Sequence, residues 1–138
     1  MHSVYLVACV GKKRESAMAA KDLYCSAWFL KAKRFVELRG GPWFILSAKH
    51  GLVHSGEVIS PYDSTLNEMS VSERRAWADL VLGQLLPLVR KGSKVIFLAG
   101  NHYREHLIPA LEVEGVEVSI PMRGLGIGKQ LSWFNANS

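Results

Sequence analysis

Residues 43–53 read Trp-Phe-Ile-Leu-Ser-Ala-Lys-His-Gly-Leu-Val, an apolar run of strand type that ends abruptly in Ser47, Lys49, His50 and Gly51. A buried strand packs through apolar side chains, so packing alone does not explain these polar residues at its end. In open parallel α/β sheets the ligand crevice lies beyond the carboxyl ends of the strands, so a reactive cluster at a strand end is where a site would be built. The segment therefore predicts both a strand of the sheet and one wall of a functional site.

The composition is that of an ordinary globular protein. The chain has 138 residues, of which 49% are hydrophobic and 21% are charged, and this is enough chain for one core. We therefore expect a single α/β domain over residues 1–138. The apolar run Val4–Val10 is too short for a transmembrane helix and lacks the basic segment that precedes a signal peptide. Two cysteines indicate neither a disulfide framework nor a zinc cluster, so we expect a cytoplasmic protein with no membrane contact.

The net charge of +5 is distributed unevenly along the chain. Residues 1–50 hold nine lysines and arginines against three acidic residues, whereas residues 51–138 hold eight against nine. A concentration of positive charge in one half is typical of a protein that binds a phosphate-bearing partner, usually nucleic acid. A solvated basic helix face is the alternative interpretation.

Apolar segments alternate with helical patterns along the whole chain. The expected strands are Val4–Val10, Trp43–Ser47, Lys94–Ala99 and Val116–Ile120. The expected helices are Ala17–Arg39, a segment that follows the capping-box pair Ser70 and Glu73 and reaches Val89, a short helix over Asn101–Glu112, and a last turn or two within Gly128–Asn135. Continuous apolar strands between helices favour a parallel sheet covered on both faces. The predicted fold is a three-layer α/β sandwich around a mostly parallel, four-stranded sheet.

Right-handed crossovers place the carboxyl ends of all parallel strands at one edge of the sheet. Polar or glycine-rich residues follow each expected strand there, whereas the opposite edge holds ordinary turn residues. The residues expected at the carboxyl edge are Cys9, Lys12 and Lys13 after the first strand, Ser47, Lys49 and His50 after the second, Asn101 and Tyr103 after the third, and Arg123 after the fourth.

The connection through Pro61, Tyr62 and Asp63 is too short and too polar to leave this edge. The Tyr62 ring offers a stacking face, and the Asp63 carboxylate offers a base or a hydrogen-bond acceptor for an amine. An Asx turn before the next helix is the alternative. Tyr24 and Ser26 in the first helix could contact a ligand in the same way or belong to the core.

Two runs match known motifs only in part. Residues 102–106 fit the H-x-x-E-H pattern of zinc enzymes, but Pro109 follows too closely for a long helix, so we expect a helix start and no metal. Residues 123–130 read Arg-Gly-Leu-Gly-Ile-Gly-Lys-Gln and lack both the hydroxyl of a P-loop and the spacing of a dinucleotide fingerprint. They favour an anion-holding loop or a turn that packs the tail on the sheet, and no cofactor is expected.

Four segments together resemble a known family. They are Cys9-x-x-Lys12-Lys13, Asp22-Leu23-Tyr24-x-Ser26-x-x-Phe29, Ser47-Ala48-Lys49-His50-Gly51-Leu52, and Pro61-Tyr62-Asp63 with the later Trp77. This combination looks like the DUF6884 domain of small bacterial and phage proteins, and the resemblance covers nearly the whole chain. More distantly, the order of the segments is similar to the core domain of archaeosine synthase, which acts on a 7-deazaguanine base in tRNA. The resemblance implies a base-recognising domain with a uracil-DNA-glycosylase-like fold.

The primary hypothesis is an enzyme that acts on a nucleobase, in nucleic acid or in a nucleotide, by N-glycosidic cleavage or by base modification. A uracil-type glycosylase places an aspartate or asparagine in the loop after the first strand, but residues 11–14 hold no carboxylate. Asp63 would therefore activate the water, while His50 or Lys49 stabilises the departing base. In a transferase, Asp63 or Ser47 would hold the incoming amine, and Cys9 or Lys49 would contact the base.

The other candidate residues would bind the substrate. Tyr24 or Tyr62 would stack on an extruded base, Asn101 would read its edge, and phosphates would be neutralised by Lys12, Lys13 and Arg123. Ser26 and Tyr103 complete the predicted binding residues. A non-catalytic module that binds nucleic acid or a nucleotide, of phage or mobile-element origin, is the alternative. A metal-dependent hydrolase is the third possibility.

Overall fold

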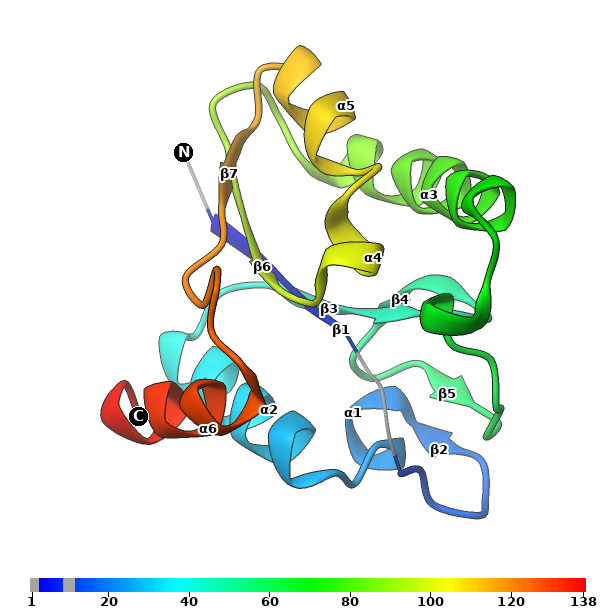
Figure 1. The fold of residues 1–138 in the computed structure, drawn as a ribbon, viewed down its shortest axis with the longest axis vertical. Coiled ribbons are helices and arrows are strands. Elements are labelled where there is room, and N and C mark those ends of the chain that lie inside the picture. Colours follow the sequence, from blue (N-terminus) through cyan, green and yellow to red (C-terminus); the bar gives the residue numbers. More distant parts are fainter. Residues whose placement is uncertain (1–2, 9–11) are drawn as a thin grey trace.

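A computed structural model describes residues 3–8 and 12–138 of the chain. Its centre is a five-stranded sheet in the order β4-β3-β1-β6-β7 (Figure 1). Neighbouring strands pair in parallel except for β4, which runs antiparallel to β3. The strands are β1 (Ser3–Ala8), β3 (Trp43–Ser47), β4 (Gly51–His54), β6 (Lys94–Leu98) and β7 (Glu117–Ser119), and a separate two-stranded antiparallel ribbon joins β2 (Met18–Ala19) to β5 (Val58–Ile59).

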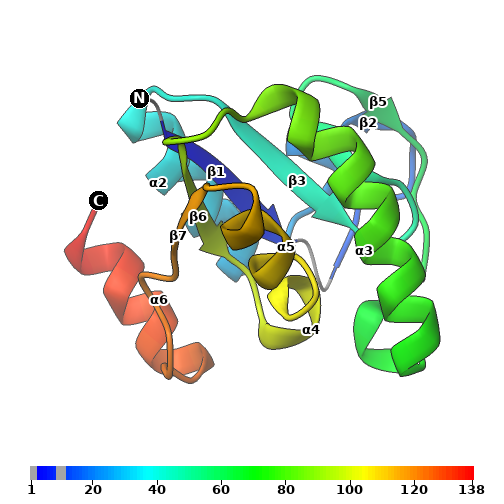
Figure 2. The ribbon, with the colours of Figure 1, turned by 90° about the horizontal axis from the view of Figure 1, so that it is seen from above.

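Helices cover both faces of the central sheet. The helices α2 and α6 lie on one face, and α3, α4 and α5 lie on the other (Figure 2). The helical segments are α1 (Ala20–Leu23), α2 (Ala27–Arg39), α3 (Val71–Leu85), α4 (Asn101–Arg104), α5 (Ile108–Val113) and α6 (Ile127–Ala136), with 3₁₀ turns η1 (Leu66–Glu68) and η2 (Leu86–Leu88). The predicted three-layer α/β arrangement with a mostly parallel sheet is confirmed.

The core lies on both faces of β1, the middle strand. Leu6 and Val7 are fully buried, and Val7 lies between Ile45 of β3 and Leu98 of β6 in the register of the sheet. A strand that is covered on both faces has no polar face to present, which is why the strands read as continuous apolar runs. In the part of the chain that the structure describes, no helix has the length and apolar character needed to cross a bilayer.

The sheet has five strands, so the prediction of four is wrong. The chain reverses after Ser47, and residues 51–54 return along β3 as β4. Gly51 makes this reversal possible because its φ is +74°, and a Cβ there would collide with the side-chain amide of Gln84. Gln84 fixes the reversed strand from α3, since its Oε1 accepts a hydrogen bond from the Leu52 amide at 2.7 Å.

The single helix predicted over residues 17–39 is wrong in its first part. Residues 18–19 form β2, α1 is only four residues long, and α2 begins at Ala27. The first loop causes the interruption, because the amide of Arg14 donates to the carbonyl of Leu23 and the amide of Cys25 donates to that of Lys12. These bonds hold the backbone extended at Tyr24 and Ser26, between α1 and α2, and outweigh its helix propensity there.

The remaining helices follow the predicted order with different bounds. The capping box of Ser70 and Glu73 is present at the start of α3, as predicted. The segment predicted as one helix over 101–112 is divided into α4 and α5, and Pro109 stands in the first turn of α5, where its missing N–H is tolerated. The last helix, α6, has ten residues and is longer than the predicted turn or two.

Candidate functional site

A pocket of about 320 Å³ opens at the carboxyl edge of the sheet. Ala8 at the end of β1 and Gly100 after β6 lie on its wall, so it occupies the place where ligands bind in open α/β sheets. The other lining residues are Ser26, Trp28, Ile127 and Gln130 from the α2 and α6 side, and Asn67 and Tyr103 from the side of η1 and α4. We call this set the edge pocket.

Hydrogen bonds hold the α2 and α6 wall of the edge pocket in place. The indole Nε1 of Trp28 donates to Oε1 of Gln130 at 2.8 Å, and Nε2 of Gln130 donates to the Leu125 carbonyl at 2.7 Å. Ser26 is the N-cap of α2, and its hydroxyl accepts from the Phe29 amide at 3.2 Å. The amide and the indole therefore reach the pocket in fixed orientations.

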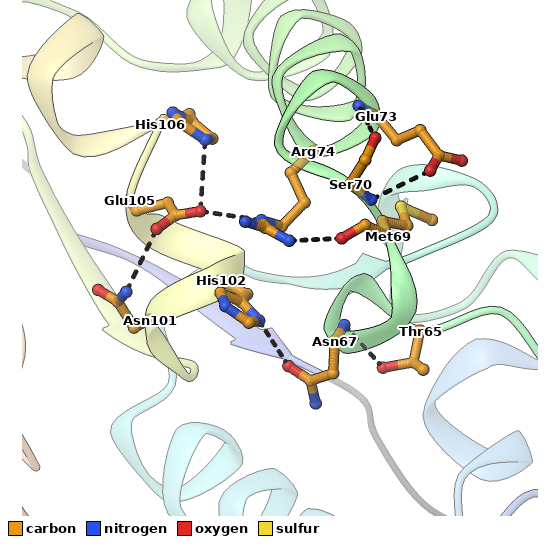
Figure 3. A network of polar contacts seen from close by, with 10 residues as sticks. All are labelled: Thr65, Asn67, Met69, Ser70, Glu73, Arg74, Asn101, His102, Glu105 and His106. Carbon is orange, nitrogen blue, oxygen red and sulfur yellow. Dashed lines mark hydrogen bonds and ion pairs between the residues drawn. The ribbon is translucent and has the colours of Figure 1, made fainter.

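The opposite wall is built from η1 and α4 (Figure 3). The carbonyl oxygen Oδ1 of Asn67 lies 2.9 Å from Nδ1 of His102, which links the two elements. Tyr103 is buried and packs edge-on against Trp77, with ring centroids 5.7 Å apart. This wall therefore presents one side-chain amide and part of one aromatic ring to the pocket.

An ion-pair network supports α4 from behind (Figure 3). Nε of Arg74 on α3 donates to Oε1 of Glu105 at 3.0 Å, and the same guanidinium donates to the carbonyl of Met69. Burial disfavours the charged form of Glu105, but the hydrogen bond from Arg74 and the charges of His106 and Arg74 outweigh it, so the pKa of this carboxyl is lowered. The network fixes α4 against α3 and thereby positions His102.

A second group of polar residues lies beyond the end of β3. The hydroxyl of Ser47 donates to that of Tyr62 at 2.8 Å, and the hydroxyls of Tyr62 and Tyr24 are 2.6 Å apart. The backbone amide of His50 donates to Oγ of Ser47 at 3.0 Å. These three side chains, Ser47, Tyr24 and Tyr62, form what we call the hydroxyl cluster. Their exposed fractions are 0%, 1% and 8%, so the cluster is closed to solvent.

Lys13 and His50 flank the hydroxyl cluster. The Lys13 ammonium lies 4.6 Å from the ring centroid of Tyr62 and 5.6 Å from that of Tyr24, and the His50 ring meets Tyr62 edge-on at 5.5 Å. Nε2 of His50 is buried and has no hydrogen-bond partner among the described residues. Because Tyr24 is 1% exposed, stacking of a ligand on its ring would require the surrounding side chains to move.

Asp63 lies in a shallow groove next to the cluster. The groove has a volume of about 320 Å³ and is lined by the basic loop after β1 and by the 61–63 connection, with lining residues Lys12, Lys13, Arg14, Glu15, Pro61, Tyr62 and Asp63. We call it the basic groove. Lys49 is exposed at the turn after β3 and lines neither the edge pocket nor the basic groove among the described residues.

The other predicted residues fall in different places. Ser26 and Tyr103 line the edge pocket. Asn101 is exposed and donates from Nδ2 to Oε2 of Glu105 at 3.3 Å, off the pocket wall. Arg123 is exposed after β7, where its charge adds to burial in lowering the pKa of Arg104. Cys9 lies outside the described residues.

Sequence reasoning did not identify the two side-chain amides of the edge pocket, those of Asn67 and Gln130. Asn67 lies in η1, in the connection between β5 and α3, and no recognisable motif marks it in the sequence. Gln130 stands where a P-loop would have its Ser or Thr hydroxyl, so the motif does not predict a role for it. Both residues become functional candidates only through partners that are distant in sequence, His102 and Trp28.

The described residues contain no group of three or more histidine, cysteine, aspartate or glutamate side chains that could hold a metal ion. The two histidines of the H-x-x-E-H run have different neighbours. His102 bonds to Asn67, whereas Nε2 of His106 lies 3.3 Å from Oε1 of Glu105, and that carboxylate is shared with Arg74.

Comparison with known proteins identifies the family of the chain. No curated protein and no solved structure matches it. A family model does match, and it covers residues 4–136, nearly the full length. The chain therefore belongs to DUF6884, a family of unknown function.

Proposed function

We propose that this protein recognises a nucleobase, carried by a nucleotide or by nucleic acid, in the edge pocket. The observation that carries the proposal is the composition of the pocket wall, where Trp28 and Tyr103 supply aromatic surface and Asn67 and Gln130 supply side-chain amides. A planar heterocycle needs apolar contact and a few in-plane hydrogen bonds, and amides that are held in place supply such bonds. The volume of about 320 Å³ lies near the lower end of the range for small-molecule sites, which suits a base better than a large cofactor.

The positive charge of the loop after β1 supports a ligand that carries phosphate. Lys12, Lys13 and Arg14 line the basic groove. Positive side chains in this position would contact the phosphates of a nucleotide or of a nucleic-acid strand while the base is read in the pocket. Arg123 would add a further phosphate contact at the carboxyl edge. The resemblance to the archaeosine synthase core, with its uracil-DNA-glycosylase-like fold, favours the same class of ligand.

Calorimetric titration with the four common ribonucleosides, their 5′-monophosphates and short single-stranded oligonucleotides tests the proposal. At least one base should bind, and Gln130→Ala should weaken binding about tenfold, because the variant loses an amide and frees the Trp28 indole. Asn135→Ala, an exposed change on the same helix outside the pocket lining, is the matched control and should bind normally. Binding that Gln130→Ala leaves unchanged, or no binding of any ligand, would contradict the proposal.

The basic groove makes a separate prediction within the same titrations. The double variant Lys12→Gln and Lys13→Gln should bind nucleosides normally but should bind monophosphates and oligonucleotides less tightly, with a shallower dependence on salt concentration. Equal salt dependence in the variant and the wild-type protein would remove these lysines from phosphate binding.

An enzyme that cleaves or modifies the base is the second candidate, and the position of Asp63 favours it. Its carboxylate lies in the basic groove beside Tyr62 and Lys13, where it could activate water or hold an amine. In contrast, no carboxylate of residues 3–8 and 12–138 lines the edge pocket. Mass spectrometry of DNA, tRNA and nucleotides incubated with the protein should then show a released base or a mass gain, and Asp63→Ala should abolish it while binding persists. Full turnover by Asp63→Ala would exclude this role.

A further inference from the structure

The polar side chains of the edge pocket keep hydrogen-bond donors free, while each of their oxygens already takes part in one hydrogen bond. Asn67 shows this most clearly. Its Oδ1 lies 2.9 Å from Nδ1 of His102, and a carbonyl oxygen can only accept, so this contact requires the His102 tautomer with its hydrogen on Nδ1. The amide nitrogen Nδ2 has no hydrogen-bond partner among the described residues, and Figure 3 shows it pointing away from His102.

The opposite wall repeats this arrangement. Oε1 of Gln130 accepts from the Trp28 indole, and Nε2 donates one of its two hydrogens to the Leu125 carbonyl, which leaves one N–H for a ligand. The hydroxyl of Ser26 accepts from the Phe29 amide, which leaves its O–H to donate. Donors therefore face the pocket from both sides.

A pocket with this lining discriminates between bases by their exocyclic groups. Uracil, hypoxanthine and guanine present a carbonyl oxygen that can accept from Asn67, whereas cytosine and adenine present an amino group at the equivalent position. An amino group that faces a donor leaves both unpaired, and desolvating unpaired polar groups is costly.

We propose that the edge pocket selects a carbonyl-bearing base over its amino-bearing counterpart, with Asn67 reading the carbonyl oxygen. This inference rests on the proposed function, because it names the class of base that the same pocket accepts. His102 is a positioning residue. It holds Oδ1 of Asn67 away from the ligand, and the Arg74–Glu105 ion pair fixes the helix on which it stands.

The test compares two matched pairs of nucleosides by calorimetry, uridine with cytidine and inosine with adenosine. The wild-type protein should prefer the carbonyl member of each pair by about tenfold or more. Asn67→Asp replaces the donor with an acceptor and should reverse the preference. Asn135→Asp makes the same chemical change on an exposed residue that does not line the pocket, so it should keep the wild-type preference.

Variants of His102 separate positioning from binding. His102→Ala frees the Asn67 amide to rotate, so the ratio of the two affinities should fall toward one while the weaker-binding member gains. His102→Gln retains an N–H that can donate to Oδ1 and should restore most of the ratio. A merely structural role for His102 would instead lower both affinities together and leave their ratio unchanged.

The outcomes distinguish failure of the inference from failure of the proposed function. Equal binding of the two members of each pair, or an unchanged ratio in Asn67→Asp, would overturn the inference and leave base recognition in place. Absence of binding by every nucleoside would overturn the proposed function, and the inference with it. Asn67 is exposed, so its variants should fold normally, and Asn67→Ala gives a second check because its ratio should approach one.

Discussion

The edge pocket and the hydroxyl cluster both lie where parallel strands end, but they use their polar groups in opposite ways. In the cluster, the hydroxyls of Ser47, Tyr62 and Tyr24 bond to one another and are closed to solvent. In the pocket, Asn67 and Gln130 each keep a donor for a ligand. A polar residue at the carboxyl edge of the sheet therefore indicates function only when part of its hydrogen-bonding capacity is left unused. We therefore propose that the cluster serves stability and that the pocket serves recognition.

The largest expected effect is the loss of stability when the ring of Tyr24 is removed. Tyr24 is 1% exposed and packs against Phe29 with ring centroids 5.2 Å apart. Tyr24→Ala should lower the free energy of unfolding by about 3–5 kcal/mol, because it leaves a cavity and breaks the hydroxyl cluster. Urea unfolding followed by circular dichroism measures the change. Tyr24→Phe keeps the ring and should cost about 1 kcal/mol, and equal losses in the two variants would show that packing is not the main term.

The second largest effect is a loss of stability when the Ser47 hydroxyl is removed. This substitution distinguishes a structural cluster from a catalytic one. Ser47→Ala should lower the free energy of unfolding by about 1–3 kcal/mol, since it leaves the His50 amide without the Ser47 acceptor and removes the hydrogen bond from Ser47 to the Tyr62 hydroxyl. The exposed Ser64→Ala is the control and should be neutral. If Ser47→Ala unfolds at the wild-type urea concentration but loses an activity, the assignment of the cluster to stability is wrong.

Asn67 should show the reverse behaviour. Asn67→Ala should change the free energy of unfolding by less than about 0.5 kcal/mol, because the side chain is exposed, yet it should weaken binding of uridine or inosine about tenfold. Parallel urea unfolding and calorimetry on the same preparation measure both quantities. A variant that loses stability and binding together would erase the contrast between the two regions.

The smallest effect is expected outside both regions, at the capping box of α3. The hydrogen bonds from the backbone and side chain of Ser70 lower the pKa of Glu73. The stabilisation from this carboxylate is therefore present above its unfolded-state pKa and is lost as the pH falls through the folded-state pKa. Glu73→Gln should be less stable than the wild-type protein at neutral pH and equally stable in acid, with normal nucleoside binding at neutral pH. A difference in stability that persists in acid would contradict the pKa shift.

The sequence predicts the parts of the fold that local patterns control. The apolar runs of β1, β3, β6 and β7 and the capping box of Ser70 depend on neighbouring residues, and all of them are present. The reversal at Gly51 is different, because it depends on a positive φ and on Gln84, which lies more than thirty residues away. The interruption of the first helix likewise depends on backbone bonds from the loop that contains Lys12 and Arg14.

In the candidate site too, the sequence predicts what neighbouring residues control and misses what distant residues control. The polar end of β3 correctly marks the carboxyl edge, where the structure brings Ser47, His50, Tyr62 and Lys13 together. Residue type alone could not show that Ser47 would be fully buried and paired. Nor could it distinguish the two neighbouring asparagines that α4 and η1 bring to this edge, since Asn101 bonds to Glu105 while Asn67 lines the pocket.

The most direct test of the division between the two regions is a nuclear magnetic resonance titration of ¹⁵N-labelled protein with uridine and with inosine. The largest shifts should occur in the side-chain amides of Asn67 and Gln130 and in the indole N–H of Trp28, while the backbone amides of Ser47 and Tyr62 should change little. The largest shifts at Ser47, His50 and Tyr62, with the pocket amides unmoved, would contradict this division.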